Sequence, residues 1–160
     1  MEYNPDVHHR HSIRLIEYDY SRSGAYFITI CTHNRECIFG EIVDRVMNYT
    51  ELGNIAASHW QNLARHHPNI EIDESIVMPN HLHGIIIIDG SSKPISEIIR
   101  GFKTFSARQI NKLLDRTGIP VWQRNYYERI IRSEDELNNV RQYVINNPAN
   151  WNEDKNNINP

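Results

Sequence analysis

The sequence predicts an α+β fold, and three observations support this prediction. Short runs rich in β-branched and aromatic residues alternate with longer segments whose apolar residues recur at helical spacing. Proline, glycine or asparagine stands between most of these segments, where a turn is needed. The predicted elements follow the order β-α-β-β-α-β, and one more helix comes after them. This order is typical of the ferredoxin-like, or split βαβ, arrangement: an antiparallel sheet with helices on one face, here with an additional C-terminal helix.

The first two elements are predicted from β-rich composition and from helical spacing. A strand is expected over residues 26–32, which are β-rich and follow Gly24. An amphipathic helix is expected from about Asp44 to His66, and Pro68 stops it soon afterwards. The apolar face of this helix would consist of Val46, Tyr49, Leu52, Ile55, Ala56, Trp60 and Leu63.

The central part of the chain predicts a β-hairpin and a second helix. Alternating residues predict a strand over 70–78, and the apolar run 82–88 predicts the strand that pairs with it. The turn between them is expected at residues 78–80, Met-Pro-Asn. Ser96 is expected to cap a helix that ends before residues 118–120, Gly-Ile-Pro. Its apolar face would consist of Ile98, Ile99, Phe102, Phe105, Ile110, Leu113 and Leu114.

The C-terminal part predicts a fourth strand and a third helix. The strand is expected within residues 121–132. Ser133 and Glu136 stand at capping-box spacing, so the helix is expected to start there and to stop before Pro148.

Length and composition bound the class of protein. The 160 residues suit one domain, expected over residues 1–160 with its core at about 12–151 and polar, loosely ordered arms at 1–11 and 152–160. A net charge of −3 argues against a protein that coats nucleic acid non-specifically, although it does not exclude a local basic face. The chain has no apolar run of the roughly 18–20 residues that a membrane span needs, and its N-terminus lacks the apolar stretch of a signal peptide. We therefore expect a cytoplasmic protein.

The most informative residues are the histidines at the start of the third strand. His81 and His83 are separated by two, so their side chains project from the same face of a strand, and Leu82 points to the opposite face. Two adjacent imidazoles can bind a metal ion. Gly84 would remove bulk beside them. Taken alone, the pattern is weak, since an isolated H-x-H is more often two polar residues on an exposed sheet face.

The third helix offers partners for the histidines. Tyr143 and Asn147 are four residues apart and therefore lie on one helix face. Asn147 offers an amide oxygen, a ligand that suits hard cations, and Tyr143 offers a phenol that can attack phosphorus. Tyr143 could equally be an apolar core residue beside Leu137 and Val140.

Three segments, taken together, resemble one family. The stretch VMPNHLHGIIII, residues 77–88, resembles the HUH motif of single-tyrosine transposases. Residues 122–132 and 142–148 look like the conserved block and the catalytic helix of the branch called REP-associated tyrosine transposases, and residues 24–29 match its first strand in style. The resemblance covers roughly residues 10–151.

The resemblance implies a function and a set of site residues. His81 and His83 match the two metal-binding histidines, Tyr143 the nucleophile, and Asn147 the polar residue that completes the metal site. The implied activity is DNA transposition and recombination through an endonuclease step, in which metal-dependent cleavage and rejoining of single-stranded, hairpin-containing DNA passes through a 5′-phosphotyrosine. The implied cofactor is Mg²⁺ or Mn²⁺, no nucleotide cofactor is expected, and a monomer is favoured over a homodimer that exchanges the tyrosine helix.

Basic and aromatic residues outside this set are candidates for DNA contacts. The aromatic candidates for stacking on unpaired bases are Trp122, Tyr126 and Tyr127, and the last two are also rival nucleophiles. The candidate DNA-binding residues are Arg10, Arg14, Lys103, Arg108, Arg124, Tyr126, Arg129 and Arg132.

Three other functions remain open from the sequence. The first is a domesticated protein that binds hairpin DNA without cutting it. The second is an RNA-binding ferredoxin-like module, which would need aromatic residues on its central strands, whereas residues 85–88 are all isoleucine. The third is a hydrolase in which a metal-bound water attacks, so that no protein-linked product would form.

Overall fold

The computed structural model describes residues 23–90 and 92–158 of the chain. In chain order its elements are β1 (Gly24–Cys31), η2 (His33–Arg35), β2 (Gly40–Val43), β3 (Val46–Tyr49), α2 (Glu51–Gln61), α3 (Leu63–His66), β4 (Ile70–Met78), β5 (His81–Ile88), α4 (Ile95–Leu113), β6 (Tyr127–Ile131), α5 (Glu134–Asn146) and η3 (Pro148–Glu153). The predicted arm at residues 1–11 lies outside the described residues.

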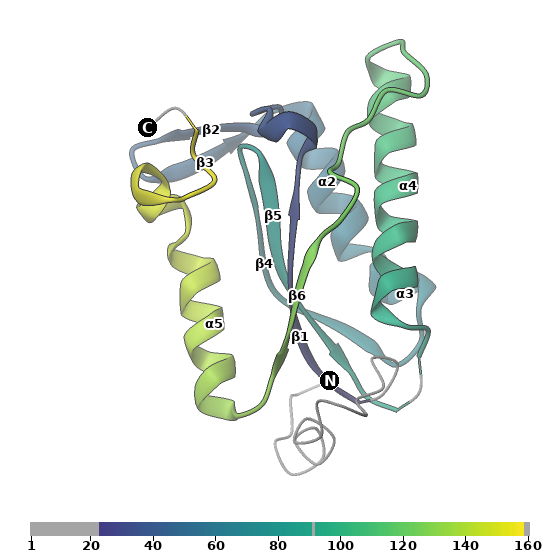
Figure 1. Cartoon of the computed structure of the whole chain (residues 1–160), viewed down its shortest axis with the longest axis vertical. Helices are drawn as coiled ribbons and strands as arrows, with labels where there is room; N and C mark the ends of the chain where they lie inside the picture. The colour runs from purple at the N-terminus through teal and green to yellow at the C-terminus, as the bar shows by residue number, and fades with distance from the viewer. Residues whose placement is uncertain (1–22, 91, 159–160) are drawn as a thin grey trace.

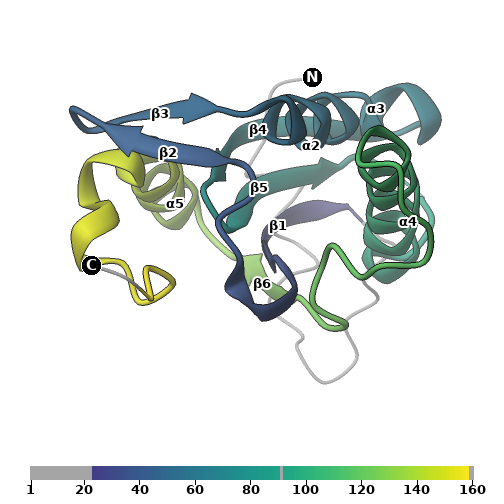
Figure 2. The same cartoon turned by 90° about the horizontal axis from the view of Figure 1, so that it is seen from above.

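The main sheet has the predicted ferredoxin-like topology. Its strand order is β4-β5-β1-β6, and every neighbouring pair is antiparallel. Helices α2 and α4 cover one face of this sheet, and α5 lies against the other face (Figures 1 and 2). The additional C-terminal helix therefore turns an open sheet into the middle of three layers. No helix among the described residues is both long and apolar enough to cross a membrane.

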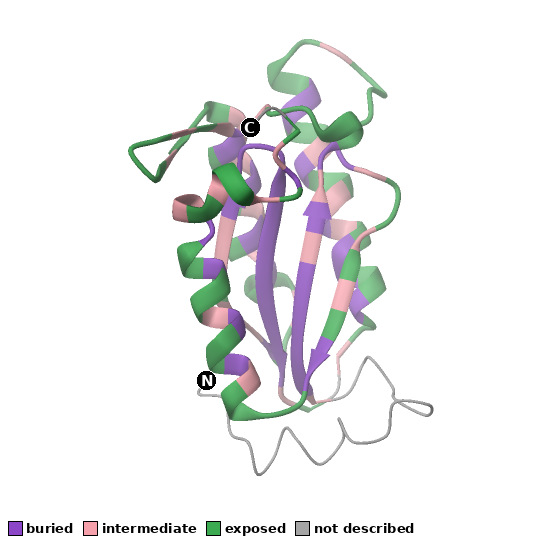
Figure 3. Cartoon of the chain, turned by 60° about the vertical axis from the view of Figure 1, so that its left-hand side comes forward, coloured by how far each residue is buried: buried purple, intermediate pink, exposed green. Residues whose placement is uncertain are grey.

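The two faces of the central strands build two separate cores. On β1, Tyr26, Ile28 and Ile30 face α2 and α4, whereas Ala25 and Phe27 face α5. The same alternation holds on β5, whose eight residues are all buried (Figure 3). Because β5 is covered on both sides, its second half, residues 85–88, is a continuous apolar run in the sequence.

Residues 44–49 do not belong to the first helix, so the prediction of a helix from Asp44 is wrong. They form the turn and second strand of a β2–β3 hairpin, in which Asp44 and Arg45 take left-handed φ values of 51° and 66°. A two-residue turn with two positive φ values matches the twist of a hairpin. The helix begins at Glu51, after Thr50 caps it by accepting from the Gly53 N–H. The sequence misled because Val46 and Tyr49 fit a helical period.

Helix α5 starts where the capping box predicted. The Ser133 hydroxyl accepts from the Glu136 N–H at 3.0 Å, and the Glu136 carboxylate accepts from the Arg132 N–H at 3.0 Å. The same carboxylate also pairs with Arg129 of β6. This junction fixes the angle at which α5 turns back over the sheet, and so it fixes where Tyr143 stands.

Candidate metal and nucleophile site

The two histidines of β5 lie beneath α5. His81 and His83 share a strand face with Ile85 and Ile87, which pack against α5. They are 0% and 3% exposed, and their ring centroids are 4.6 Å apart. The interpretation of two polar residues on an exposed sheet face is therefore wrong, because α5 and the chain after it cover this end of the strand.

One hydrogen bond at Nδ1 orients each imidazole. Asn80 Oδ1 lies 2.9 Å from His81 Nδ1, and Thr29 Oγ1 lies 2.8 Å from His83 Nδ1. The Asn80 amide is itself fixed, since its Nδ2 donates to the carbonyls of Arg35 and Asn156. Asn80 Oδ1 can only accept, so His81 Nδ1 carries the proton and Nε2 keeps its lone pair. Such outer partners hold metal-binding histidines in a productive orientation.

Two oxygen donors approach the histidines from the C-terminal side. Asn147, the residue after α5, is 3% exposed, and its amide lies close enough to His81 to raise the pKa of that ring. Asp154, just after η3, brings a carboxylate oxygen to 3.8 Å from His81 Nε2. One ligand atom each from His81, His83 and Asp154 lie within 4.8 Å of one another.

Asp154 is a site residue that sequence reasoning missed. It lies in residues 152–160, which were expected to be a loosely ordered arm. In the structure Asn156 is buried, and its backbone carbonyl accepts from Asn80 at 2.6 Å. Within the described residues of this segment, Asn156 is therefore packed on the site. Trp151, tilted toward His81 with ring centroids 6.0 Å apart, was the one local signal that this segment packs on the site.

The donor set of this site fits a divalent cation. His81 Nε2, His83 Nε2 and Asn147 Oδ1 are buried and have no hydrogen-bond partner in ordinary geometry within the described part of the chain. Buried polar atoms are rarely left unpaired without a reason, and a bound ion is one such reason. Two imidazoles with amide and carboxylate oxygens form a mixed set that suits Mn²⁺ and, with water and phosphate oxygens, Mg²⁺.

Burial keeps both imidazoles neutral. It lowers the pKa of His81 to about 4, although Asp154 and Asn147 act in the opposite direction. Burial also lowers the pKa of His83 well below its ordinary value, and the positive charge of Lys155 adds to this effect. Because His81 is neutral at pH 7, its contact with Asp154 is not an ion pair. A neutral imidazole is the form that binds metal ions.

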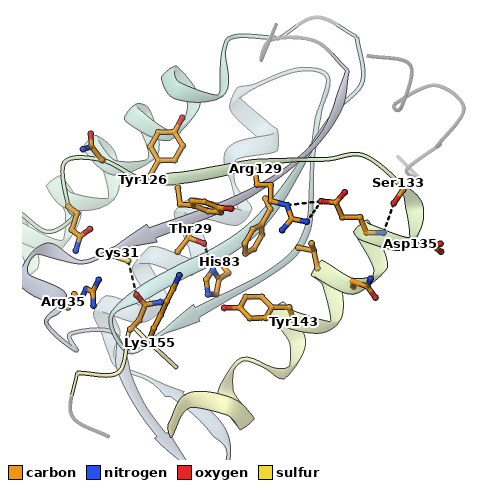
Figure 4. A pocket seen from close by; sticks show the side chains of 18 residues that line it. Thr29, Cys31, Arg35, His83, Tyr126, Arg129, Ser133, Asp135, Tyr143 and Lys155 are labelled. Atoms are coloured by element: carbon orange, nitrogen blue, oxygen red, sulfur yellow. Dashed lines mark hydrogen bonds and ion pairs between the residues drawn. The ribbon is translucent and has the colours of Figure 1, made fainter. Parts of the chain in front are cut away.

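Tyr143 is the exposed tyrosine of α5, and it stands over His83. The two ring centroids are 5.3 Å apart, and the Tyr143 side chain is 47% exposed. Figure 4 shows the ring pointing from α5 toward His83 across the mouth of a groove. Leu137 and Val140 of the same helix are buried against the sheet. Tyr143 is thus not a core residue, contrary to the alternative left open by the sequence.

The groove beside these residues has a volume of about 830 Å³ and runs between α5 and the β1–β6 side of the sheet. Two cations that were not among the predicted DNA-binding residues line it, Arg35 of η2 and Lys155 (Figure 4). Both are exposed, and neither has an ion-pair partner among the described residues. Both are near enough to act electrostatically on the site, since Arg35 lowers the pKa of His81 and Lys155 that of His83.

The predicted DNA-binding residues do not gather in one place. Arg10 and Arg14 lie outside the described residues. Lys103 donates to the carbonyls of Gln123, Arg124 and Asn125, so its ammonium holds the loop before β6 and is not free for phosphate. Arg124 and Arg132 are exposed near the two ends of β6, and Arg108 is exposed on α4, across the sheet from the groove.

The residues of β6 point alternately to the two faces. Tyr126, just before β6, packs against the core under α4, donates its hydroxyl to Glu128 at 2.7 Å and also lines the groove. Tyr127 lies opposite Thr29 and faces the groove. Arg129 also faces the groove, but its guanidinium is paired with Glu136.

Gly84 has a different role from the expected one. Its position faces α2, where an added Cβ would lie 2.3 Å from Cζ2 of Trp60. The glycine therefore makes room for Trp60 on the opposite face and not for the histidines.

Two curated relatives come from Haemophilus influenzae. One, a protein without an assigned function, is 41% identical over 96% of this chain and 96% of its own length. The other, provisionally named a REP-associated tyrosine transposase, is 25% identical over 82% of this chain and 73% of its own length.

Two solved structures have a similar fold. A REP-associated tyrosine transposase bound to a REP hairpin superposes with a TM-score of 0.63 at 19% identity, over 87% of this chain and 74% of that one. A protein of Deinococcus radiodurans, provisionally described as a transposase, gives a TM-score of 0.51 at 21% identity, over 81% of this chain and 93% of that one.

The family model described as "Transposase IS200 like" matches residues 20–147, which include β1, the two histidines of β5 and the whole of α5. This match agrees with the resemblance to the REP-associated tyrosine branch that the motifs carry. The chain belongs to the IS200-like transposase family.

Proposed function

We propose that this protein cleaves and rejoins single-stranded DNA in a metal-dependent reaction with Tyr143 as the nucleophile. The observation that supports this most is a group of three buried, unpartnered acceptor atoms, His81 Nε2, His83 Nε2 and Asn147 Oδ1, next to α5, with the ring of His83 5.3 Å from the exposed ring of Tyr143. A site made only for folding would have paired these atoms or replaced them with apolar groups.

The metal would be held by His81, His83, Asn147 and, beyond the set implied by the motif, Asp154. When bound, a divalent cation polarises an oxygen of the scissile phosphate. Asn80 and Thr29 keep the Nε2 atoms of the two imidazoles aimed into the site. Arg35 and Lys155 would hold the flanking phosphates, since their side chains line the same groove.

The chemical step exchanges one phosphoester for another. The Tyr143 oxygen attacks phosphorus in line with the 3′ oxygen; the bond between phosphorus and the phenolic oxygen forms as the bond to the 3′ oxygen breaks. The phenol releases its proton to solvent, and the leaving oxygen takes one up to become a 3′-OH. The DNA downstream of the cut stays attached to Tyr143 through its 5′ phosphate. In the reverse step a 3′-OH attacks this linkage, which rejoins a strand and restores the phenol.

The expected substrate is hairpin-containing DNA, because the solved relative with the higher TM-score is described as bound to a REP hairpin. Helix α5 packs on the sheet of its own chain, so Tyr143 and the histidines meet without a second subunit. This packing supports a monomer as the active unit.

The test is a covalent-adduct assay on hairpin DNA with single-stranded tails, labelled at either end, in Mn²⁺, Mg²⁺ or EDTA. We expect a metal-dependent adduct that carries the DNA 3′ of the cut. Tyr143→Phe should abolish the adduct and keep DNA binding, whereas Tyr49→Phe, at an exposed tyrosine on β3 outside this groove, should change neither.

Three results would contradict this function. An adduct that persists in Tyr143→Phe would exclude this residue as nucleophile. Cleavage without any protein-linked product would favour attack by a metal-bound water. Tight, metal-independent binding without cleavage across a panel of hairpins would favour a domesticated DNA-binding protein.

A further inference from the structure

Tyr127 is an exposed aromatic residue in the same row of the sheet as His83. His83 of β5 lies opposite Thr29 of β1, and Thr29 lies opposite Tyr127 of β6. Adjacent strands are about 4.8 Å apart, so the backbones of His83 and Tyr127 are separated by two spacings, about 10 Å. Tyr127 is 53% exposed, which leaves its ring open to the groove.

One buried phenylalanine connects Tyr127 to the reacting residues. The Phe27 ring meets Tyr127 edge to face at 6.4 Å and Tyr143 at 6.1 Å between centroids, and it stacks on His83 at 5.4 Å. Tyr127 is therefore held beside the nucleophile by a rigid apolar support. A side chain that served only to fill the core would not leave more than half of its surface in the groove.

The part of the groove formed by β6, the loop before it and α5 is not suited to phosphate. Its one cation, Arg129, is neutralised by Glu136, and Asp135 adds a negative charge at the start of α5 (Figure 4). The cations of the groove that have no ion-pair partner in the described part of the chain, Arg35 and Lys155, come instead from η2 and from the segment after η3.

Besides Arg129, which interacts with the Tyr127 side chain, the polar residues that share the groove with Tyr127 include three carboxamides. Gln123 and Asn125 of the preceding loop and Asn139 of α5 line the groove, and their side chains make no hydrogen bond within the described part of the chain. A carboxamide carries both donors and an acceptor and can match the edge of an unpaired base. An exposed aromatic ring with carboxamides in the same groove suits the binding of a nucleobase, whereas phosphate binding needs unpaired cations.

We propose that Tyr127 is the stacking platform of a nucleobase site, which takes one unpaired base of the substrate strand next to the scissile phosphate. The carboxamides of Gln123, Asn125 and Asn139 hydrogen-bond to the edge of that base, and this site thereby selects the base next to the cut. The proposal rests on the proposed function for the identity of the strand, but not on cleavage itself.

The test separates binding from cleavage. Tyr143→Phe protein, which forms no adduct, is titrated with hairpin DNA carrying short single-stranded tails, and 5-iododeoxyuridine is placed at each tail position in turn for photo-crosslinking. We expect one position to crosslink to Tyr127. In this background Tyr127→Ala should weaken binding roughly 5- to 150-fold, since stacking on one aromatic side chain contributes about 1–3 kcal/mol per base. Tyr127→Phe, which keeps the ring, should retain the affinity.

The control is Phe105→Ala, an aromatic of similar exposure, 57%, on α4 and across the sheet. An abasic nucleotide at the crosslinking position should weaken binding to the parent and to Phe105→Ala, but not further to Tyr127→Ala. A merely structural role for Tyr127 would not produce this loss of coupling.

The two proposals fail in different ways. Crosslinks that avoid Tyr127, or equal affinity of Tyr127→Ala and its parent, would overturn the nucleobase site even if the Tyr143 adduct forms. Crosslinking to Tyr127 with the expected loss of affinity, in a protein that never forms an adduct, would uphold the base site and overturn cleavage.

Discussion

Replacing Asn147 with leucine should stabilise the metal-free protein and weaken its metal site. The residue is 3% exposed, its Oδ1 has no hydrogen-bond partner in ordinary geometry, and its Nδ2 makes one contact at the limit of hydrogen bonding, 3.5 Å to the Tyr143 carbonyl. A buried acceptor left unpaired costs about 1–3 kcal/mol, and leucine removes it at similar volume. Asn147→Leu should therefore gain about 1–3 kcal/mol in EDTA, or about 2–4 °C in Tm for each kcal/mol.

Bound metal should reduce the stability advantage of Asn147→Leu, because it stabilises the native protein more than the variant. At a Mn²⁺ concentration about 100 times its Kd, the native protein gains about 2.7 kcal/mol. Loss of one ligand that weakens the site ~10-fold would reduce this gain to about 1.4 kcal/mol. Urea unfolding and thermal shift, each with EDTA and with Mn²⁺, measure both effects, and Asn146→Leu, at the exposed neighbouring position, is the control. A variant that is less stable in EDTA and keeps the full metal shift would refute the assignment of Asn147 as a ligand.

Three further predictions concern the walls and the charge of the site. Gly84→Ala places a Cβ 2.3 Å from the ring of Trp60, so it should destabilise the fold by about 1–3 kcal/mol in urea; an unchanged midpoint would show that α2 can shift freely. Asp154→Asn removes a charge at the His81 contact and should weaken Mn²⁺ binding roughly 10- to 100-fold in titration calorimetry, whereas equal affinity would remove Asp154 from the ligand set. Burial lowers the pKa of His81 to about 4 and that of His83 well below 6.5, so the unfolded chain takes up protons that the folded one does not. The stability that the two neutral imidazoles contribute to the metal-free protein should be complete above pH 6.5. As the pH drops toward 4, the free energy of unfolding should fall by about 1.4 kcal/mol per pH unit for each histidine. A flat profile would mean that the imidazoles are not buried in their neutral form.

The part of the fold that could be predicted is the part with strong local patterns. The buried run of β5, the capping box at Ser133 and the Pro-Asn turn before His81 each fix their element from neighbouring residues alone. The β2–β3 hairpin could not be predicted, because its turn has no glycine or asparagine and its strands are short and exposed.

The candidate site was predicted where its residues share one element and missed where they meet across elements. Spacing suggested His81 and His83, and likewise Tyr143 and Asn147, and the family resemblance made them the predicted site residues. Asp154 lies in a polar segment without periodicity, and only its docking through Asn156 brings it to the histidines.

Tyr126 and Tyr127 both line the groove, but strand register determines that Tyr127 lies on the same sheet face as His83. Ile130 and Ile131 are both buried, so the strand shows no alternation that would separate the side of Tyr126 from the side of Tyr127. Only the pairing of Thr29 with Tyr127 places Tyr127 over the site face.

Peptide mapping of the covalent product tests the nucleophile most directly. Trypsin releases residues 142–155 as a peptide whose only tyrosine is Tyr143, and it releases Tyr126 and Tyr127 together in residues 125–129. After reaction with hairpin DNA in Mn²⁺ and nuclease digestion, mass spectrometry should find a 5′-phosphonucleotide on the 142–155 peptide, and none when EDTA replaces the metal. The same mass on the 125–129 peptide, or a 3′-phosphate linkage, would contradict Tyr143 as the residue that attacks the DNA.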